Sequence, residues 1–163
     1  MRTQWASLLM ALAVVSSAAT AADTTPAFLL QAAAVNRFQI SAGQLAVRKT
    51  QAEVVHGFAH QMILDYSAAG MKLRQAAADA KLPVPRDALD EKHKALMDQL
   101  TRTPPGKTLT KAYFETQDKV LRDDLALFEG YAKNGDNERL KYFAQEMVPV
   151  LRGHLEQLGK LKK

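Results

Sequence analysis

The sequence predicts an all-α fold. Apolar residues recur at steps of three and four through four long stretches of the chain, and this spacing places them on one face of an α-helix. No segment alternates polar and apolar residues for long enough to indicate a β-strand. Clusters of proline, glycine and asparagine separate the stretches, as is typical of turns. The chain is therefore expected to form long helices joined by turns.

The first two long helices are expected on either side of a break near Thr50. The first begins at Thr24-Thr25-Pro26, where hydroxyl groups can cap a helix and proline fits its first turn. The second runs from about Ala52 to Ala80. It ends before Leu82-Pro83-Val84-Pro85, because proline disfavours helix at its own position and at the residue before it.

A short charged helix and two further long helices are expected after these prolines. The short helix runs from about Arg86 to Leu100 and stops at Thr103-Pro104-Pro105-Gly106. The third long helix covers roughly Thr108 to Lys133, and Asn134-Gly135-Asp136-Asn137 forms the turn after it. The last long helix begins at about Glu138.

The lengths of the connections predict the topology. The links near Thr50 and Asn134 are short, so each joins two antiparallel helices into a hairpin. The segment from Lys81 to Lys107 is long enough to return along the length of the helices. Two hairpins joined by one long crossover are typical of ferritin-like four-helix bundles. The predicted fold is therefore a ferritin-like four-helix bundle with a short extra helix in the crossover.

Residues 1–21 are expected to be an export signal. Arg2 supplies a positive start, Trp5 to Val15 is a short apolar run, and Ala19-Thr20-Ala21 fits the cleavage rule for small residues. No later stretch approaches the roughly 20 apolar residues of a membrane-spanning helix. We therefore expect residues 22–163 to form one exported domain that is periplasmic, with association with the outer membrane left open.

Composition excludes several classes of function. The chain has no cysteine, which excludes disulfides, thiolate zinc sites and thiol catalysis. Its net charge of +5 is mild and scattered, whereas a nucleic-acid surface would need clustered basic residues. There is no phosphate-binding loop, dinucleotide fingerprint or nucleophile motif. We therefore predict no catalytic residues and no nucleic-acid partner.

Polar residues interrupt each apolar face near its middle. Gln39 and Asp65 lie at nearly equal distances in sequence from the first turn, and Gln117 and His154 are placed similarly about the second. Each hairpin should therefore bring its polar residues to one level of the bundle. The residues expected to meet in this way are Gln39, Asp65, Tyr66, Gln117 and His154, with Asp124 nearby.

Two interpretations of these residues remain open. In the favoured one, Gln39, Asp65, Tyr66, Gln117 and His154 form a buried hydrogen-bond network that fixes the register of the helices. In the other, a single divalent metal binds to Asp65, Asp124 and His154. A dinuclear carboxylate site would need a glutamate from each of two helices and Glu-x-x-His from the other two, and amides are weak ligands for iron or zinc. No cofactor is therefore expected.

Three other features invite a functional interpretation. Glu53-x-x-His56 is the only Glu-x-x-His motif, but its helical phase points away from the apolar face, so a solvated surface is expected. His93 belongs to the short charged helix and is expected at the surface or in a lid. Gly43 and Gly70 suggest either close packing of helices or a cavity for a small ligand.

The chain resembles a known family at two motifs, Phe58-Ala59-x-x-Met62-x-x-Asp65 and Val148-Pro149-x-Leu151-x-x-His154-Leu155. These motifs are similar to those of exported bacterial proteins called domain of unknown function 4142 (DUF4142), often labelled predicted outer membrane proteins. The resemblance implies a ferritin-like four-helix bundle in the periplasm or at the outer membrane, and it implies no activity.

Three positions depart from the pattern of that family. A glutamate usually stands at the position of Gln39, and histidines usually stand at the positions of Tyr66 and Leu121. Asp65 and His154 keep the pattern. If the polar residues of the family form a metal or proton-transfer centre, this chain has lost much of it.

The function expected from the sequence is therefore that of a non-enzymatic exported protein of the bacterial cell envelope. It would have a binding or structural role toward an unidentified envelope component, and its metal site would be degenerate. The alternative is a periplasmic metal- or oxidant-handling protein that uses Asp65, Asp124 and His154. A small-ligand carrier is a third hypothesis, and the oligomeric state is left undetermined.

Overall fold

The computed structural model describes residues 24–162, which contain helices and no β-strand. The helices are α1 (Thr25–Lys49), α2 (Glu53–Asp79), α3 (Glu91–Arg102), α4 (Lys107–Asn134) and α5 (Glu138–Leu161). The prediction of an all-α fold is confirmed. The expected export signal, residues 1–21, lies outside the described residues.

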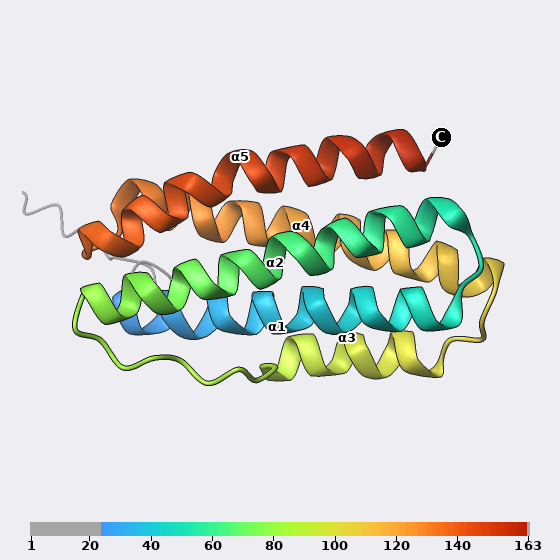
Figure 1. Ribbon diagram of the computed structural model, residues 1–163, viewed down its shortest axis with the longest axis horizontal. Coiled ribbons are helices and arrows are strands. Elements are labelled where there is room, and N and C mark those ends of the chain that lie inside the picture. The colour runs from blue at the N-terminus through green and yellow to red at the C-terminus, as the bar shows by residue number, and fades with distance from the viewer. Residues whose placement is uncertain (1–23, 163) are drawn as a thin grey trace, which may run out of the picture.

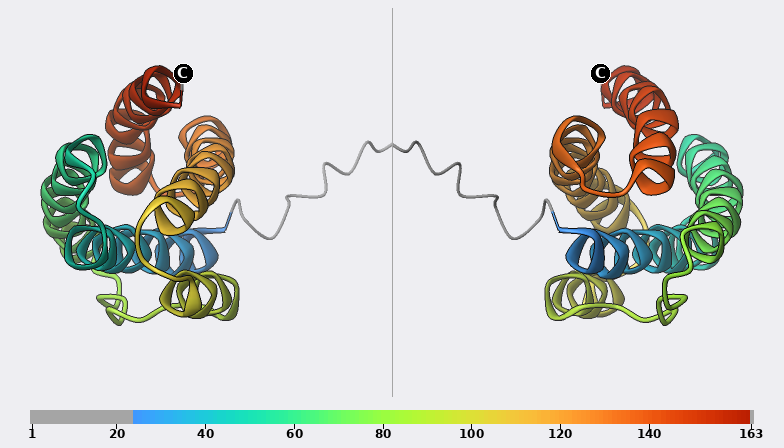
Figure 2. Two further views of the ribbon diagram at one scale, coloured as in Figure 1. Left: turned by 90° about the vertical axis from the view of Figure 1, so that its right-hand side faces the viewer. Right: turned by 90° about the vertical axis from the view of Figure 1, so that its left-hand side faces the viewer.

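The four long helices lie side by side as two antiparallel pairs. Helix α1 packs along α2, and α4 packs along α5, while α2 with α5 and α1 with α4 bring the pairs together (Figure 1). Viewed end-on, the long helices surround a common core, and α3 lies outside it against α1 (Figure 2). Residues 80–106 carry the chain from one end of the long helices to the other, with α3 within this crossover.

The helix boundaries follow the sequence closely except at the start of α3. The predicted start at Arg86 is wrong, because the helix begins at Glu91. The side chain of Asp90 accepts a hydrogen bond from the backbone N–H of His93 at 2.8 Å, which is the geometry of an N-cap. At α5 the side chain of Asn137 plays the same part for two backbone N–H groups.

Aromatic and aliphatic side chains from the long helices fill the core. Phe28 stacks on Tyr131 with ring centroids 3.9 Å apart, and Phe128 meets Phe28 edge-on at 5.3 Å. Each buried side chain of this size stabilises the fold by about 1.5–3 kcal/mol. Gly43 serves close packing here, because a Cβ at this position would lie 2.8 Å from Cγ1 of Ile63.

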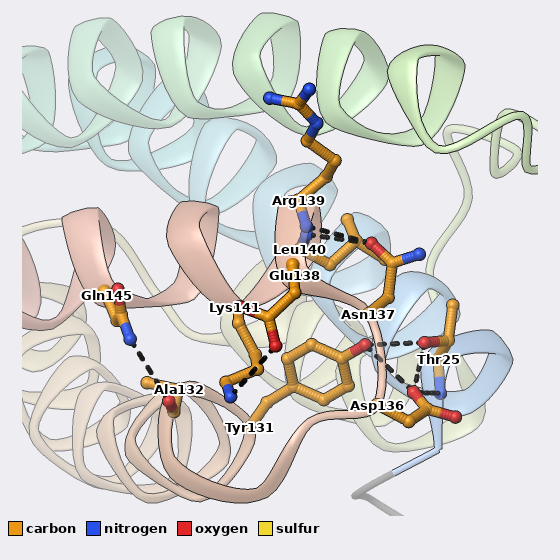
Figure 3. Close-up of polar contacts among 10 residues, drawn as sticks. All are labelled: Thr25, Tyr131, Ala132, Asp136, Asn137, Glu138, Arg139, Leu140, Lys141 and Gln145. Carbon is orange, nitrogen blue, oxygen red and sulfur yellow. Dashed lines mark hydrogen bonds and ion pairs between the residues drawn. The ribbon is translucent and has the colours of Figure 1, made fainter.

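A polar cluster fastens the start of α1 to the turn between α4 and α5 (Figure 3). The hydroxyl groups of Thr25 and Tyr131 lie 2.6 Å apart, and the backbone N–H of Thr25 donates to Oδ1 of Asp136 at 3.1 Å. The Thr25 hydroxyl also donates to the same carboxylate oxygen. These bonds join residues that are far apart in sequence, so they hold the first pair of helices to the second at this end.

Within residues 24–162, none of the helices combines the length and the apolar character needed to cross a membrane.

Candidate functional site

Six polar side chains interrupt the apolar faces of the long helices, and we call this group the polar centre: Gln39 of α1, Asp65 and Tyr66 of α2, Gln117 and Asp124 of α4, and His154 of α5. Gln39, Tyr66 and Gln117 are fully buried, and Asp124 is 2% exposed. His154 is buried as well, whereas Asp65 is half-buried. Polar groups at this depth require partners within the protein or a bound molecule.

Asp65 and His154 form one hydrogen-bonded pair. Nε2 of His154 lies 2.8 Å from Oδ2 of Asp65 and joins α5 to α2. The side-chain amide of Gln61 donates to the same oxygen at 2.8 Å. Because Asp65 takes the Nε2 side of the ring, Nδ1 of His154 is left as the second polar atom, and it has no hydrogen-bond partner among the described residues.

Gln39 and Asp124 form a second hydrogen-bonded pair. Nε2 of Gln39 donates to Oδ2 of Asp124 at 3.3 Å and joins α1 to α4. Burial raises the pKa of Asp124 to about 7, although the hydrogen bond from Gln39 and the charge of Lys92 oppose that rise. Near neutral pH this carboxyl group is therefore divided between its protonated and ionised forms.

Tyr66 and Gln117 are the two members of the polar centre that belong to neither pair. The hydroxyl of Tyr66 and both polar atoms of the Gln117 side chain are buried and unpartnered within residues 24–162. Burial, and then the charges of Asp124 and Asp65, raise the pKa of Tyr66 well above its usual value. The ring of Tyr66 packs near that of His154, with centroids 5.7 Å apart. Burial thus favours the neutral phenol form of Tyr66, which lies within electrostatic reach of both pairs.

The structure divides the three residues that the sequence offered as metal ligands. Asp65 and His154 are in contact, but Asp124 accepts a hydrogen bond from Gln39 instead. In the described part of the chain, no three histidine, cysteine, aspartate or glutamate side chains are grouped so that they could hold a metal ion. The polar centre therefore contains two separate pairs that each link two helices, and Tyr66 and Gln117 belong to neither pair.

Residues 11–161 match the family model described as "Domain of unknown function (DUF4142)". The chain belongs to the DUF4142 family. The match includes all of the described helices and begins inside the expected export signal. Neither the curated proteins nor the solved structures contain a match to the chain.

His93 of this DUF4142 protein lies in the interior, so its expected surface position is wrong. It is 3% exposed, and its ring packs at a tilt against that of Phe38, with centroids 5.1 Å apart. Nδ1 of His93 lies 2.8 Å from Oδ1 of Asp90. Burial lowers the pKa of His93, and the charge of Asp90 acts against this. The signal was present in the sequence, because His93, Leu96 and Leu100 fall on one helical face.

Asp90 and His93 border a small cavity of about 80 Å³ that reaches Asp124 of the polar centre, with Lys92 and Asp123 also on its wall. Lys92 and Asp123 form an ion pair at 2.8 Å, which links α3 to α4. The cavity therefore lies between α3 of the DUF4142 chain and the buried carboxyl group of Asp124.

The Glu53-x-x-His56 motif lies away from the polar centre. Glu53 and His60 are exposed, and Nε2 of His56 contacts the backbone carbonyl of Thr50 at 2.6 Å. His56 thus supports the turn between α1 and α2 in this structure.

Sequence reasoning missed Asn36, which is 5% exposed and whose side-chain amide has no partner in residues 24–162. Asn36 precedes Gln39 by three residues and shares its helix face, so the spacing could have revealed it.

Proposed function

We propose that this member of the DUF4142 family is a non-enzymatic protein of the bacterial cell envelope, and that it acts by binding another envelope component. In this proposal the polar centre holds the helices in register and carries out no reaction. The observation that supports this structural role of the polar centre is the way the two pairs cross the molecule. Gln39 with Asp124 links α1 to α4, and Asp65 with His154 links α2 to α5. Each pair therefore joins the first helix hairpin to the second.

The proposed fold is the ferritin-like four-helix bundle. Two antiparallel hairpins joined by one long crossover support it, and α3 is the extra helix within the crossover. The proposed location is the periplasm, either free or associated with the outer membrane. The signal pattern of residues 1–21 supports export.

The test combines metal analysis with a stability measurement. Purified protein is exposed to iron, manganese, zinc and copper, desalted and analysed for bound metal. We expect no stoichiometric binding. His154→Ala is expected to lower the free energy of unfolding by about 2–4 kcal/mol, because it leaves the partly buried Asp65 without its imidazole and opens a cavity. His60→Ala serves as the control, since His60 is exposed and its loss should change stability little.

The second candidate function is metal or oxidant handling by Asp65, Asp124 and His154. The buried Nδ1 of His154, which has no partner in the described part of the chain, is the observation that favours it, because a free imidazole nitrogen is a good metal ligand. Stoichiometric metal that is retained by His60→Ala and lost in His154→Ala would establish this function and overturn the first proposal.

A further inference from the structure

A groove lies between the middle of α1 and the C-terminal half of α2, and the crossover segment borders it. Its volume is about 310 Å³. Ala33 and Asn36 contribute from α1, Tyr66, Gly70 and Arg74 from α2, and Pro85 from the crossover. This volume is at the lower end of the range for small-molecule sites, and such sites combine apolar walls with a few placed polar groups.

Asn36 is a buried polar group in the wall of the groove. It is 5% exposed, and both Nδ2 and Oδ1 of its side chain are buried without a partner in residues 24–162. Buried amides in proteins are nearly always hydrogen-bonded, and an unpaired one destabilises the fold. No atom of residues 24–162 satisfies this amide, and the groove that Asn36 lines is the side from which a bound molecule would reach it.

Gly70 opens the wall beside Asn36. A Cβ at Gly70 would lie 3.6 Å from Nδ2 of Asn36 and 3.6 Å from Nη1 of Arg74. The side chains of Asn36 and Arg74 therefore both lie next to the space that a side chain at position 70 would occupy. These are ordinary contact distances, so alanine would fit without a clash. Glycine inside a helix is less favourable than alanine by about 1 kcal/mol, and the packing of α2 does not require it here.

Arg74 gives the groove a positive charge. Its side chain is exposed, and it forms no ion pair or hydrogen bond with any residue of 24–162. The other charged group on the wall, Asp87, is paired with Arg37 at 3.5 Å. The guanidinium group is always protonated, and it binds a carboxylate through two parallel hydrogen bonds. The free charge of the groove therefore favours an anion.

We propose that this groove is a binding site for a small organic carboxylate. Arg74 pairs with the carboxylate group, the amide of Asn36 bonds to a polar atom of the ligand, and an apolar body packs on Ala33, Leu73 and Pro85. This inference names a ligand class for the binding role proposed above. It stands apart from the polar pairs, because none of the groove's polar groups takes part in them.

The test is a titration of isotope-labelled protein with benzoate and with hexanoate, followed by amide chemical shifts. Benzamide, which has the same ring and no charge, is the matched probe. We expect saturable shifts for the carboxylates around residues 33–40 and 66–74, and weaker binding of benzamide. Arg74→Gln should weaken carboxylate binding about tenfold or more, because it removes a charge-assisted pair of hydrogen bonds.

Two further variants separate binding from folding. Gly70→Ala should weaken binding and raise the melting temperature, since it fills the wall and favours helix. Gly57→Ala is its control, because Gly57 lies in the same helix with nothing within 4 Å of an added Cβ. It should raise the melting temperature and leave binding unchanged. Asn36→Leu should abolish binding without loss of stability.

Absence of saturable shifts for both carboxylates, or shifts that persist unchanged in Arg74→Gln and Gly70→Ala, would overturn the groove proposal. Either result leaves the metal and stability measurements on His154 unaffected, so failure of the groove proposal is distinguishable from failure of the proposed function.

Discussion

At the scale of single residues, Asp124 is the most unusual group in the molecule. It is a carboxyl group with 2% exposure and one hydrogen bond, from an uncharged amide. Burial disfavours its ionised form, and its pKa rises from 3.8 to about 7. Because the folded state holds the proton more tightly than the unfolded state, folding is favoured when the group is protonated. Asp124 therefore makes stability depend on pH.

The sign of this dependence can be tested with Asp124→Asn. The contribution of Asp124 is fully present below pH 3.8, falls as pH rises toward 7, and is lost above 7. Asparagine keeps an oxygen for Gln39 and does not ionise. The variant should therefore equal the wild type near pH 4 and exceed it by on the order of 2–4 kcal/mol at pH 8. Urea unfolding at a series of pH values measures the difference.

Asp123→Asn is the control for this experiment. Asp123 is the exposed neighbour that pairs with Lys92, and surface pairs contribute little. A free-energy difference between Asp124→Asn and wild type that stays constant from pH 4 to pH 8 would contradict the burial of an ionisable carboxyl group at this position.

At the scale of helices, α3 depends on its first turn. Asp90 caps the backbone N–H of His93 and also contacts the His93 ring, both at 2.8 Å. One carboxylate thus starts the helix and orients the side chain that anchors α3 against Phe38 of α1. Besides His93, Leu100 is the one buried residue of α3. The docking of α3 therefore rests on a small number of contacts.

Asp90→Ala should loosen α3 while the long helices stay intact. Loss of an N-cap costs about 1 kcal/mol, and the variant also removes the partner of Nδ1 of His93. Amide hydrogen exchange should become faster in residues 91–102 and remain unchanged in α1 and α2. Asp98→Ala, at an exposed position of the same helix, should have no such effect. Equal exchange rates in both variants would show that Asp90 does not hold α3.

The long helices were predictable because their apolar period runs through many turns. The start of α3 depends instead on which nearby residue caps the helix. The predicted start at Arg86 followed the charged pattern, but Asp90 offers a capping oxygen and α3 begins directly after it. The sequence also placed Gln39 and Asp65 at one depth along their hairpin. It did not determine which faces of the two hairpins meet. The sequence therefore did not predict that Gln39 bonds to Asp124 and Asp65 to His154, because each partner lies in the other hairpin.

At the scale of the whole molecule, the packing of two hairpins is the central structural problem. Apolar side chains drive the hairpins together but tolerate sliding, whereas a hydrogen bond between buried groups has one favourable alignment. The hydrogen bond between Gln39 and Asp124 is of this kind and links α1 to α4, and the bond between the half-buried Asp65 and the buried His154 links α2 to α5. Thr25 and Asp136 add a further link at one end (Figure 3). We propose that these links hold the two hairpins in a single register.

A double-mutant cycle on Asp65 and His154 tests this account most directly. The free energy of unfolding is measured for the wild type, Asp65→Ala, His154→Ala and the double variant, in the presence of a metal chelator and in its absence. The account predicts a coupling energy of roughly 0.5–3 kcal/mol that the chelator does not change. Additive effects of the two substitutions, or a coupling that disappears with the chelator, would contradict it.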